Sequence, residues 1–178
     1  GLIVEPNRPT TKKTRIIAHQ QQVVRFDHEE RGELLTKTRR QLIDYVVGEL
    51  PHVDCLAISD YSKGVITVPL LRKILPEAIK RGVPIVVDPK VSHFSFYKKV
   101  TLVTPNNLEA SEASGIEIED ERSLLKAGEI LLKKLSSEAV LITRGEHGMS
   151  LFEKSGAVTH IPTEAKQVVD VSGDGDTV

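Results

Sequence analysis

The chain has 178 residues, of which 28% are charged and 39% hydrophobic, and 24 lysines and arginines against 25 aspartates and glutamates give a net charge of −1. This near balance offers no broad basic surface for nucleic acid or a membrane, and no apolar run reaches the roughly 20 residues of a membrane-spanning helix. Cys55 is the sole cysteine, so an intrachain disulfide is excluded and a reducing, cytoplasmic location is expected, with the thiol buried and inert in its apolar run.

Two short segments rich in β-branched residues follow an irregular start. Residues 14–18 and 22–26 predict strands that pair as a hairpin. Arg25 and Asp27 alternate with apolar neighbours, so they share one face of the second strand, where they meet either solvent or a substrate. An ordinary edge hairpin is the interpretation that these residues favour by themselves.

The next elements are a helix and a buried strand. Apolar residues recur with the helical period between Leu34 and Leu50, and Pro51 helps to end that helix. The run Cys55-Leu56-Ala57-Ile58 then predicts a strand buried on both faces. Asp60 and Lys63 follow at its carboxyl end, the edge of an open α/β sheet where ligands bind. They are candidate contacts to a phosphorylated, polyhydroxylated substrate, and a loop ion pair explains them equally well.

Two further strands end in the same manner. Residues 69–80 predict a helix that Pro76 should kink or divide and that Gly82 ends. Residues 83–87 and 100–103 then predict strands, followed by Asp88-Pro89-Lys90 and by Thr104-Pro105-Asn106 respectively. Three strands therefore place polar residues at their carboxyl ends, and core packing does not explain that repetition.

The remaining elements predict more α/β structure. Asn106 or Asn107 is expected to cap a helix whose first turn carries Glu109, where the helix dipole favours a carboxylate without any ligand. Residues 120–137 predict an amphipathic helix with a packing role, and residues 139–142 a fourth buried strand. The turn at residues 143–148 then leads into a hairpin at residues 149–152 and 157–161. The six histidines are scattered without the spacing of a zinc site.

The C-terminal residues form a candidate phosphate cradle. Gly173 and Gly175 allow backbone N–H groups to approach an anion closely, with Asp174 between them. Asp176 would then lie beside the transferring phosphate and accept a proton from a substrate hydroxyl. A polar turn without chemistry explains the same residues as well.

The run D-V-S-G-D-G-D-T at residues 170–177 resembles the signature of the ribokinase-like, or PfkB-type, sugar kinases, which usually reads G-A-G-D. Four other motifs are similar in order and spacing to one branch, the bacterial D-glycero-D-manno-heptose 7-phosphate kinases: S-D-Y-S-K-G at 59–64, D-P-K at 88–90, T-P-N-N-L-E at 104–109 and T-R-G-E-H-G-M-S-L at 143–151. The resemblance extends back to residues 21–27 and covers nearly the whole chain.

The resemblance implies a ribokinase-like α/β fold, in which helices flank a mainly parallel central sheet, with an antiparallel hairpin and part of a β lid. Residues 1–30 would form part of the lid and its return strand, and residues 31–178 an incomplete kinase core. The chain is expected to be truncated at both ends, because nothing in it matches the family's Gly-rich N-terminal segment or the helices that follow the signature.

The resemblance also implies an activity, which is transfer of the ATP γ-phosphate, with Mg²⁺, to the anomeric hydroxyl of the heptose 7-phosphate on the route to lipopolysaccharide core heptose. The alternatives are phosphorylation of another sugar by a kinase of the same type, and a non-catalytic protein that senses a sugar phosphate or a nucleotide. A homodimer formed through the β lid and a fused adenylyltransferase domain are implied as well.

By the same resemblance, each motif has a role. Asp176 is the catalytic base, and the anion hole is formed by Gly173, Asp174 and Gly175. The ATP-binding residues are Asn106, Asn107, Leu108, Glu109, Thr143, Gly145 and Gly148, of which Glu109 positions Mg²⁺ through water. The sugar phosphate contacts Asp60, Lys63 and Lys90. Asp174 replaces the family's alanine, and its side chain is expected to point outward.

Overall fold

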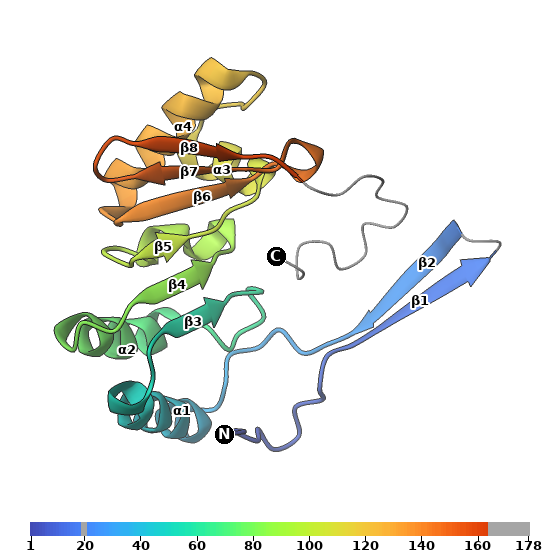
Figure 1. Cartoon of the computed structure of the whole chain (residues 1–178). Helices are drawn as coiled ribbons and strands as arrows, with labels where there is room; N and C mark the ends of the chain where they lie inside the picture. Colours follow the sequence, from blue (N-terminus) through green and yellow to red (C-terminus); the bar gives the residue numbers. More distant parts are fainter. Residues whose placement is uncertain (19–20, 164–178) are drawn as a thin grey trace. The chain divides into compact units, whose positions relative to one another are not determined.

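A computed structural model describes residues 1–18 and 21–163, and the chain divides into two compact units, Gly1–Phe96 and Tyr97–Val178. The first unit contains, in order, β1 (Lys12–Ala18), β2 (Gln21–His28), α1 (Thr36–Glu49), the 3-10 helix η1 (Leu50–His52), β3 (Leu56–Ser59), α2 (Val68–Lys80), β4 (Ile85–Asp88) and the 3-10 helix η2 (Val91–Phe96) (Figure 1). The second contains β5 (Leu102–Val103), α3 (Asn107–Ser114), α4 (Glu121–Leu135), β6 (Ala139–Thr143), η3 (Gly145–His147), β7 (Met149–Glu153) and β8 (Val158–Ile161).

The predicted N-terminal hairpin is confirmed and is longer than expected. β1 and β2 pair antiparallel from Lys12 opposite His28 to Ala18 opposite Gln21, with an irregularity between Ile16 and Ile17. Every residue of β1 is exposed, and the hairpin projects from the α/β part of its unit (Figure 1). The hairpin therefore depends on its own cross-strand hydrogen bonds and side-chain pairs.

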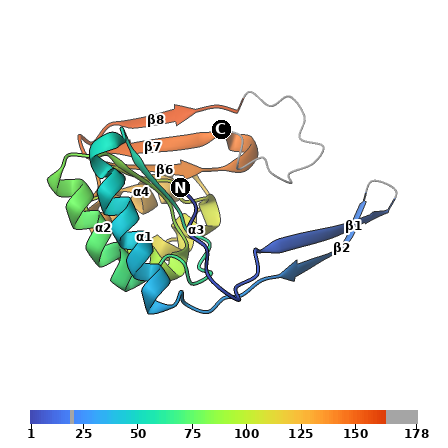
Figure 2. The same cartoon turned by 90° about the horizontal axis from the view of Figure 1, so that it is seen from below.

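The α/β part of the first unit is built on a parallel strand pair. β3 and β4 run parallel from Leu56 opposite Ile85 to Ser59 opposite Asp88, and α1 and α2 lie side by side (Figure 2). The buried face of α2 consists of Leu70, Leu71, Ile74, Leu75 and Ala78. The predicted division at Pro76 is wrong, because Pro76 lies on the exposed side of a continuous helix, where water can bind the carbonyl that proline leaves without its partner. Gly82 has the expected left-handed conformation, with φ 69°.

Two predictions about β3 are wrong. Cys55 is exposed and precedes the strand. Within the strand, Ile58 is buried whereas Ala57 and Ser59 are exposed. Alternate residues of a strand point to opposite faces, so a run of four apolar or small residues does not by itself predict burial on both faces.

The second unit contains parallel and antiparallel pairs. β5 runs parallel to β6, whereas β6, β7 and β8 are antiparallel neighbours, and the predicted hairpin turns at Gly156 with φ 90°. The predicted amphipathic helix is α4, capped by Asp120, whose side chain accepts a hydrogen bond from the Ser123 backbone N–H at 2.7 Å. The Ser123 hydroxyl also donates to this carboxylate and holds the pKa of Asp120 below its usual range. The predicted α/β fold, with parallel strands, flanking helices and an antiparallel hairpin, is thus confirmed.

Two helical glycines provide a test of this packing. Gly128 in α4 is buried, and an added Cβ would overlap the ring of the buried Phe152 from β7. Gly128→Ala should therefore lower the free energy of unfolding by about 1–3 kcal/mol, as overpacking does. Gly48 in α1 has no atom within 4 Å of such a Cβ, so Gly48→Ala should raise it by up to about 1 kcal/mol through helix propensity. Urea unfolding of the purified variants measures both, and equal effects would contradict the packing described here.

Candidate functional site

The loop that follows β3 is shaped by the carboxylate of Asp60, which is only 1% exposed. Its Oδ1 accepts a hydrogen bond from the backbone N–H of Ser62 at 2.8 Å. Such a turn supports the left-handed conformation of Ser62, with φ 53°. The Asp60 backbone N–H donates to the Asp88 carbonyl at 2.9 Å. The ends of β3 and β4 are therefore joined at the edge where the sequence predicted substrate contacts.

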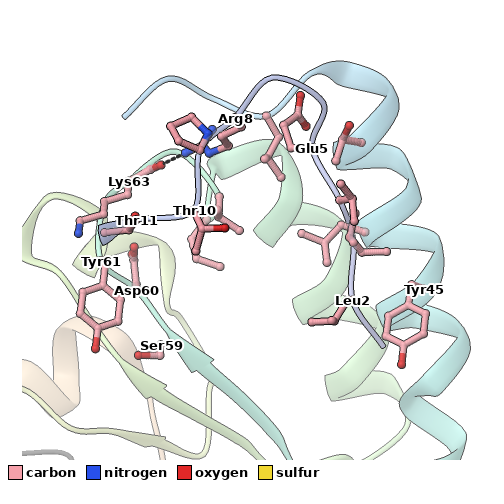
Figure 3. A pocket seen from close by; sticks show the side chains of 18 of the residues that line it. Leu2, Glu5, Arg8, Thr10, Thr11, Tyr45, Ser59, Asp60, Tyr61 and Lys63 are labelled. Atoms are coloured by element: carbon pink, nitrogen blue, oxygen red, sulfur yellow. Dashed lines mark hydrogen bonds between the residues drawn. The ribbon is translucent and has the colours of Figure 1, made fainter. Parts of the chain in front are cut away.

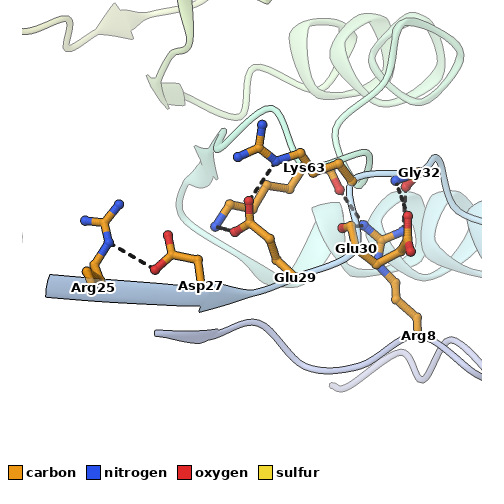
Figure 4. Close-up of polar contacts among 8 residues, drawn as sticks. Arg8, Arg25, Asp27, Glu29, Glu30, Gly32 and Lys63 are labelled. Carbon is orange, nitrogen blue, oxygen red and sulfur yellow. Dashed lines mark hydrogen bonds and ion pairs between the residues drawn. The ribbon is translucent and has the colours of Figure 1, made fainter. Parts of the chain in front are cut away.

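Lys63 is already paired with a carboxylate from the segment after the hairpin. Its Nζ lies 2.5 Å from Oε2 of Glu29, and Nε of Arg31 lies 2.7 Å from Oε1 (Figure 4). The Glu29 side chain is only 7% exposed. Hydrogen bonds from Lys63 and then Arg31 lower the pKa of Glu29. The structure thus contains the loop ion pair that the sequence left open for Lys63.

Arg8 fixes this loop to the base of the hairpin. Its guanidinium donates to the Gly32 carbonyl at 2.6 Å, the Glu30 carbonyl at 2.9 Å and the Lys63 carbonyl (Figures 3 and 4). Gly64, with φ 81°, packs so closely on Gly32 that a Cβ would overlap its carbonyl. The loop conformation thus depends on residues that lie far away in the sequence.

A cavity of about 830 Å³ adjoins the loop, within the range of about 300–1,000 Å³ that is usual for ligand pockets. Its two ends differ in polarity. Asp60, Tyr61 and Lys63 lie at one end, whereas Leu2 and Tyr45 lie at the other (Figure 3). The polar end carries two of the three predicted substrate residues, so the structure brings Asp60 and Lys63 to one cavity.

The segment after β4 contacts the same loop. Lys90, the third predicted substrate residue, is partly buried, and its carbonyl accepts a hydrogen bond from the His93 backbone N–H at 2.9 Å. Ser92 Oγ lies 3.0 Å from Ser62 Oγ, and His93 Nδ1 lies 2.7 Å from Asp60 Oδ2. The loops that carry Asp60, Lys63 and Lys90 are therefore in direct contact.

The predicted cap of α3 is confirmed for Asn106. Its side chain accepts a hydrogen bond from the Glu109 backbone N–H at 2.9 Å, and Glu109 Oε2 accepts one from the Asn106 backbone N–H at 3.1 Å. This reciprocal capping box buries Glu109. Asn107 is the first residue of the helix, and Leu108 is exposed. The carboxylate that the resemblance assigns to Mg²⁺ thus also has a structural role.

The turn after β6 adjoins this helix start. Asn106 forms a parallel bridge with Thr143, whose backbone N–H donates to the Pro105 carbonyl at 3.0 Å. Gly148, with φ 73°, lies against the Ile161 carbonyl, so that no Cβ fits there. Gly145 has open space where its Cβ would be. The predicted ATP-binding residues are therefore brought together within the second unit.

The predicted anion hole and catalytic base lie outside the residues that the structure describes. Gly173, Asp174, Gly175 and Asp176 fall among residues 164–178, beyond the described part of the chain. Within residues 1–18 and 21–163, no three or more histidine, cysteine, aspartate or glutamate side chains are grouped to hold a metal ion. One carboxylate is chemically sufficient for a water-mediated contact to Mg²⁺, because that ion keeps several of its waters.

Comparison with known proteins identifies the family. The model of the pfkB family carbohydrate kinases matches residues 1–178. The chain belongs to this family.

Among curated pfkB relatives, the chain is 47% identical over 178 residues to the bifunctional protein HldE of Geobacter sulfurreducens, and 44% identical to that of Geotalea uraniireducens. Both matches cover the whole chain but only 36% of the relative. The chain thus spans about a third of the length of the relatives that it matches.

Solved structures confirm the ribokinase-like fold of this pfkB member. Phosphofructokinase-2 from Escherichia coli in complex with substrates and products has a TM-score of 0.67 at 18% identity, over 86% of this chain and 50% of that one. Arabidopsis thaliana ribokinase complexed with ribose and ATP has a TM-score of 0.68 at 18% identity, over 96% of this chain and 54% of that one.

No helix in the described residues has the length and apolar character to cross a membrane.

Sequence reasoning missed Arg8, Glu29 and His93. Arg8 and Glu29 precede the resembling motifs or lie between them, and their partners are distant in the chain. His93 follows Lys90 by three positions, which was the only local signal that it belongs to a polar strand end. Each of these residues acts through a tertiary contact that no periodicity or spacing predicts.

The lowered pKa of Glu29 predicts a pH-dependent contribution to stability. The contribution is fully present above the ordinary glutamate pKa and is lost as the pH falls through the lowered pKa of the folded protein. Glu29→Gln should therefore lower Tm at neutral pH, with a difference from wild type that shrinks in acid. Glu33→Gln is the matched control, because Glu33 is exposed and pairs with Arg39 at 3.0 Å, and such surface pairs contribute little. Thermal melts across pH would contradict the assignment if both variants behaved alike.

Proposed function

We propose that this pfkB chain is the kinase part of a bifunctional protein and phosphorylates D-glycero-D-manno-heptose 7-phosphate at its anomeric hydroxyl, using ATP, in the synthesis of ADP-heptose for lipopolysaccharide. The observation that carries the proposal is 47% identity over all 178 residues to a bifunctional HldE protein. The motifs at 59–64, 88–90, 104–109 and 143–151 support the same branch. The protein is proposed to work in the cytoplasm.

The first unit is proposed to bind the sugar phosphate. Asp60, Lys63 and the segment from Lys90 meet at the carboxyl ends of β3 and β4, which is where ligands bind in open α/β sheets. Lys63 has three N–H donors, so it can keep Glu29 as a partner and still donate to a phosphate. The adjoining cavity has the size for a sugar phosphate.

The second unit is proposed to bind ATP. The start of α3 and the turn after β6 are adjacent, and helix starts and glycine turns present backbone N–H groups to phosphates. Gly145 has open space on its side, whereas Gly148 has a packing role. A carboxylate offers about four acceptor positions, so Glu109 can cap its helix and also hold a water of Mg²⁺.

The C-terminal signature is proposed to perform the proton transfer. Phosphoryl transfer has a loose transition state, so an enzyme mainly positions the reactants and neutralises charge. The N–H groups of Gly173, Asp174 and Gly175 would stabilise the phosphate, and Asp176 would remove the proton of the acceptor hydroxyl. The support for these roles is the sequence motif itself, since these residues lie outside the part of the chain that the structure describes.

The partners follow from the same relatives. The matched proteins are bifunctional, and an adenylyltransferase is the proposed second domain. A homodimer through the hairpin is proposed because β1 and β2 expose Ile16, Ile17, Val23 and Phe26, and a projecting two-stranded hairpin with apolar side chains is a surface that a partner covers.

ADP release by the full-length protein, measured with a panel of sugar phosphates, tests the proposed activity and the role of Asp176. The heptose 7-phosphate should be the best acceptor. Asp176→Asn should lower kcat by about 10²–10⁴, the usual contribution of a general base, with ATP affinity little changed. Asp174→Ala keeps the backbone N–H and should stay within a few-fold of wild type. Near-normal turnover by Asp176→Asn would contradict the role of Asp176 as the general base. Preference for another sugar phosphate would contradict the proposed substrate.

Glu109→Gln separates metal positioning from capping. Glutamine can still accept the hydrogen bond from Asn106, so the helix start should be kept. If Glu109 also orders Mg²⁺, the variant should have a lower kcat and a higher Mg²⁺ requirement, with a smaller change in KM for the sugar phosphate. A fall in Tm with an unchanged Mg²⁺ dependence would leave only the structural role.

A further inference from the structure

His93 and Asp60 form a side-chain pair that joins the loops after β3 and β4. His93 Nδ1 lies 2.7 Å from Asp60 Oδ2. A carboxylate only accepts hydrogen bonds, so Nδ1 carries the proton. The Asp60 side chain is 1% exposed and that of His93 is 21% exposed. The pair thus has a buried end, which is the carboxylate, and an accessible end, which is the imidazole.

The contacts of Asp60 indicate a positioning role. One carboxylate oxygen accepts from the Ser62 backbone N–H and the other from His93. Burying a carboxylate costs free energy, which these hydrogen bonds offset. A direct contact between Asp60 and a sugar would have to share or displace one of them. Asp60, which the sequence predicted as a substrate contact, therefore holds Ser62 and His93 in position.

His93 is held from several sides but keeps one nitrogen available. The ring of Phe96 lies 6.1 Å from its ring at 45°, and the Ser62–Ser92 contact at 3.0 Å docks its segment onto the loop. Nε2 has no hydrogen-bond partner within the described residues. In the tautomer with the proton on Nδ1, Nε2 carries a lone pair and accepts a hydrogen bond.

We propose that His93 binds a hydroxyl of the acceptor sugar through Nε2, and that Asp60 is the positioning residue that fixes its tautomer and orientation. The inference rests on the proposed function, since it names a sugar contact within that site. Its basis is the contact of His93, in the segment that starts at Lys90, with Asp60 at the carboxyl ends of two parallel strands, where Asp60 lines the same cavity as Lys63. The Nε2 lone pair there accepts a hydrogen bond from a hydroxyl, whereas the lysine ammonium groups suit the phosphate.

Two variants of the full-length protein separate these roles. His93→Asn keeps an amide N–H near the position of Nδ1, so it can still donate to Asp60, but it lacks Nε2. Asp60→Asn keeps an oxygen for the Ser62 N–H but presents an NH₂ group to His93, which shifts the proton to Nε2. His52→Asn is the matched control, because His52 is exposed in η1.

Steady-state kinetics with D-glycero-D-manno-heptose 7-phosphate give the first readout. Each single variant should raise KM for the sugar phosphate about tenfold, as expected for one lost hydrogen bond, with a smaller change in kcat and none in KM for ATP. The double variant should be no worse than His93→Asn, because Asp60 acts through His93. An unchanged sugar KM in His93→Asn, or additive effects in the double variant, would overturn the proposal.

¹⁵N spectra of histidine-labelled protein give a second readout that does not need turnover. Wild-type His93 should show a protonated Nδ1 and an unprotonated Nε2. In Asp60→Asn the proton should lie on Nε2 instead. Addition of the heptose 7-phosphate to wild type should shift the Nε2 signal. If wild type turned over no sugar phosphate, the proposed function would fail, and this titration would still decide the contact. If it preferred another sugar phosphate, the same measurements would use that compound. The absence of any Nε2 shift would overturn the inference.

Discussion

The buried carboxylate of Asp60 is the constraint on which the first unit's candidate site depends. A charged group in the interior requires hydrogen bonds, and here they come from Ser62 in its own loop and from His93 in the segment after the next strand. Satisfying one carboxylate therefore fixes the left-handed residue in one loop and the docking of another. Lys63, in the same loop, is held separately by the Glu29 carboxylate and by Arg8, which donates to its carbonyl.

Local patterns predicted those parts of the structure that local physics decides. The spacing Asn106-x-x-Glu109 predicted a capped helix, because both hydrogen bonds of that cap join residues three positions apart. The amphipathic period of α4 and the glycine turn of the last hairpin were confirmed for the same reason. The burial of Cys55 and the division of α2 at Pro76 were predicted wrongly because both outcomes depend on which face of an element is covered, and composition does not contain that information.

The candidate site was predicted as a set of strand ends but not as a network. Parallel strands place their carboxyl ends at one edge, so Asp60, Lys63 and Lys90 could be grouped from the sequence. Their partners could not, because His93 lies 33 positions from Asp60 and the Arg8 side chain contacts a carbonyl 55 positions away. The sequence motifs thus indicated which loops form the candidate site. The tertiary contacts show which side-chain atoms in those loops are already hydrogen-bonded within the protein.

Gly148 illustrates how a motif residue can report on something other than chemistry. Its backbone lies against the Ile161 carbonyl with a positive φ, so alanine would be excluded by the path of β8 alone. A relative of this chain that had lost its kinase activity, but kept its hairpin, would still need glycine here. Glycine at this position in a newly sequenced relative would therefore report that the hairpin is kept, and would say nothing about nucleotide binding.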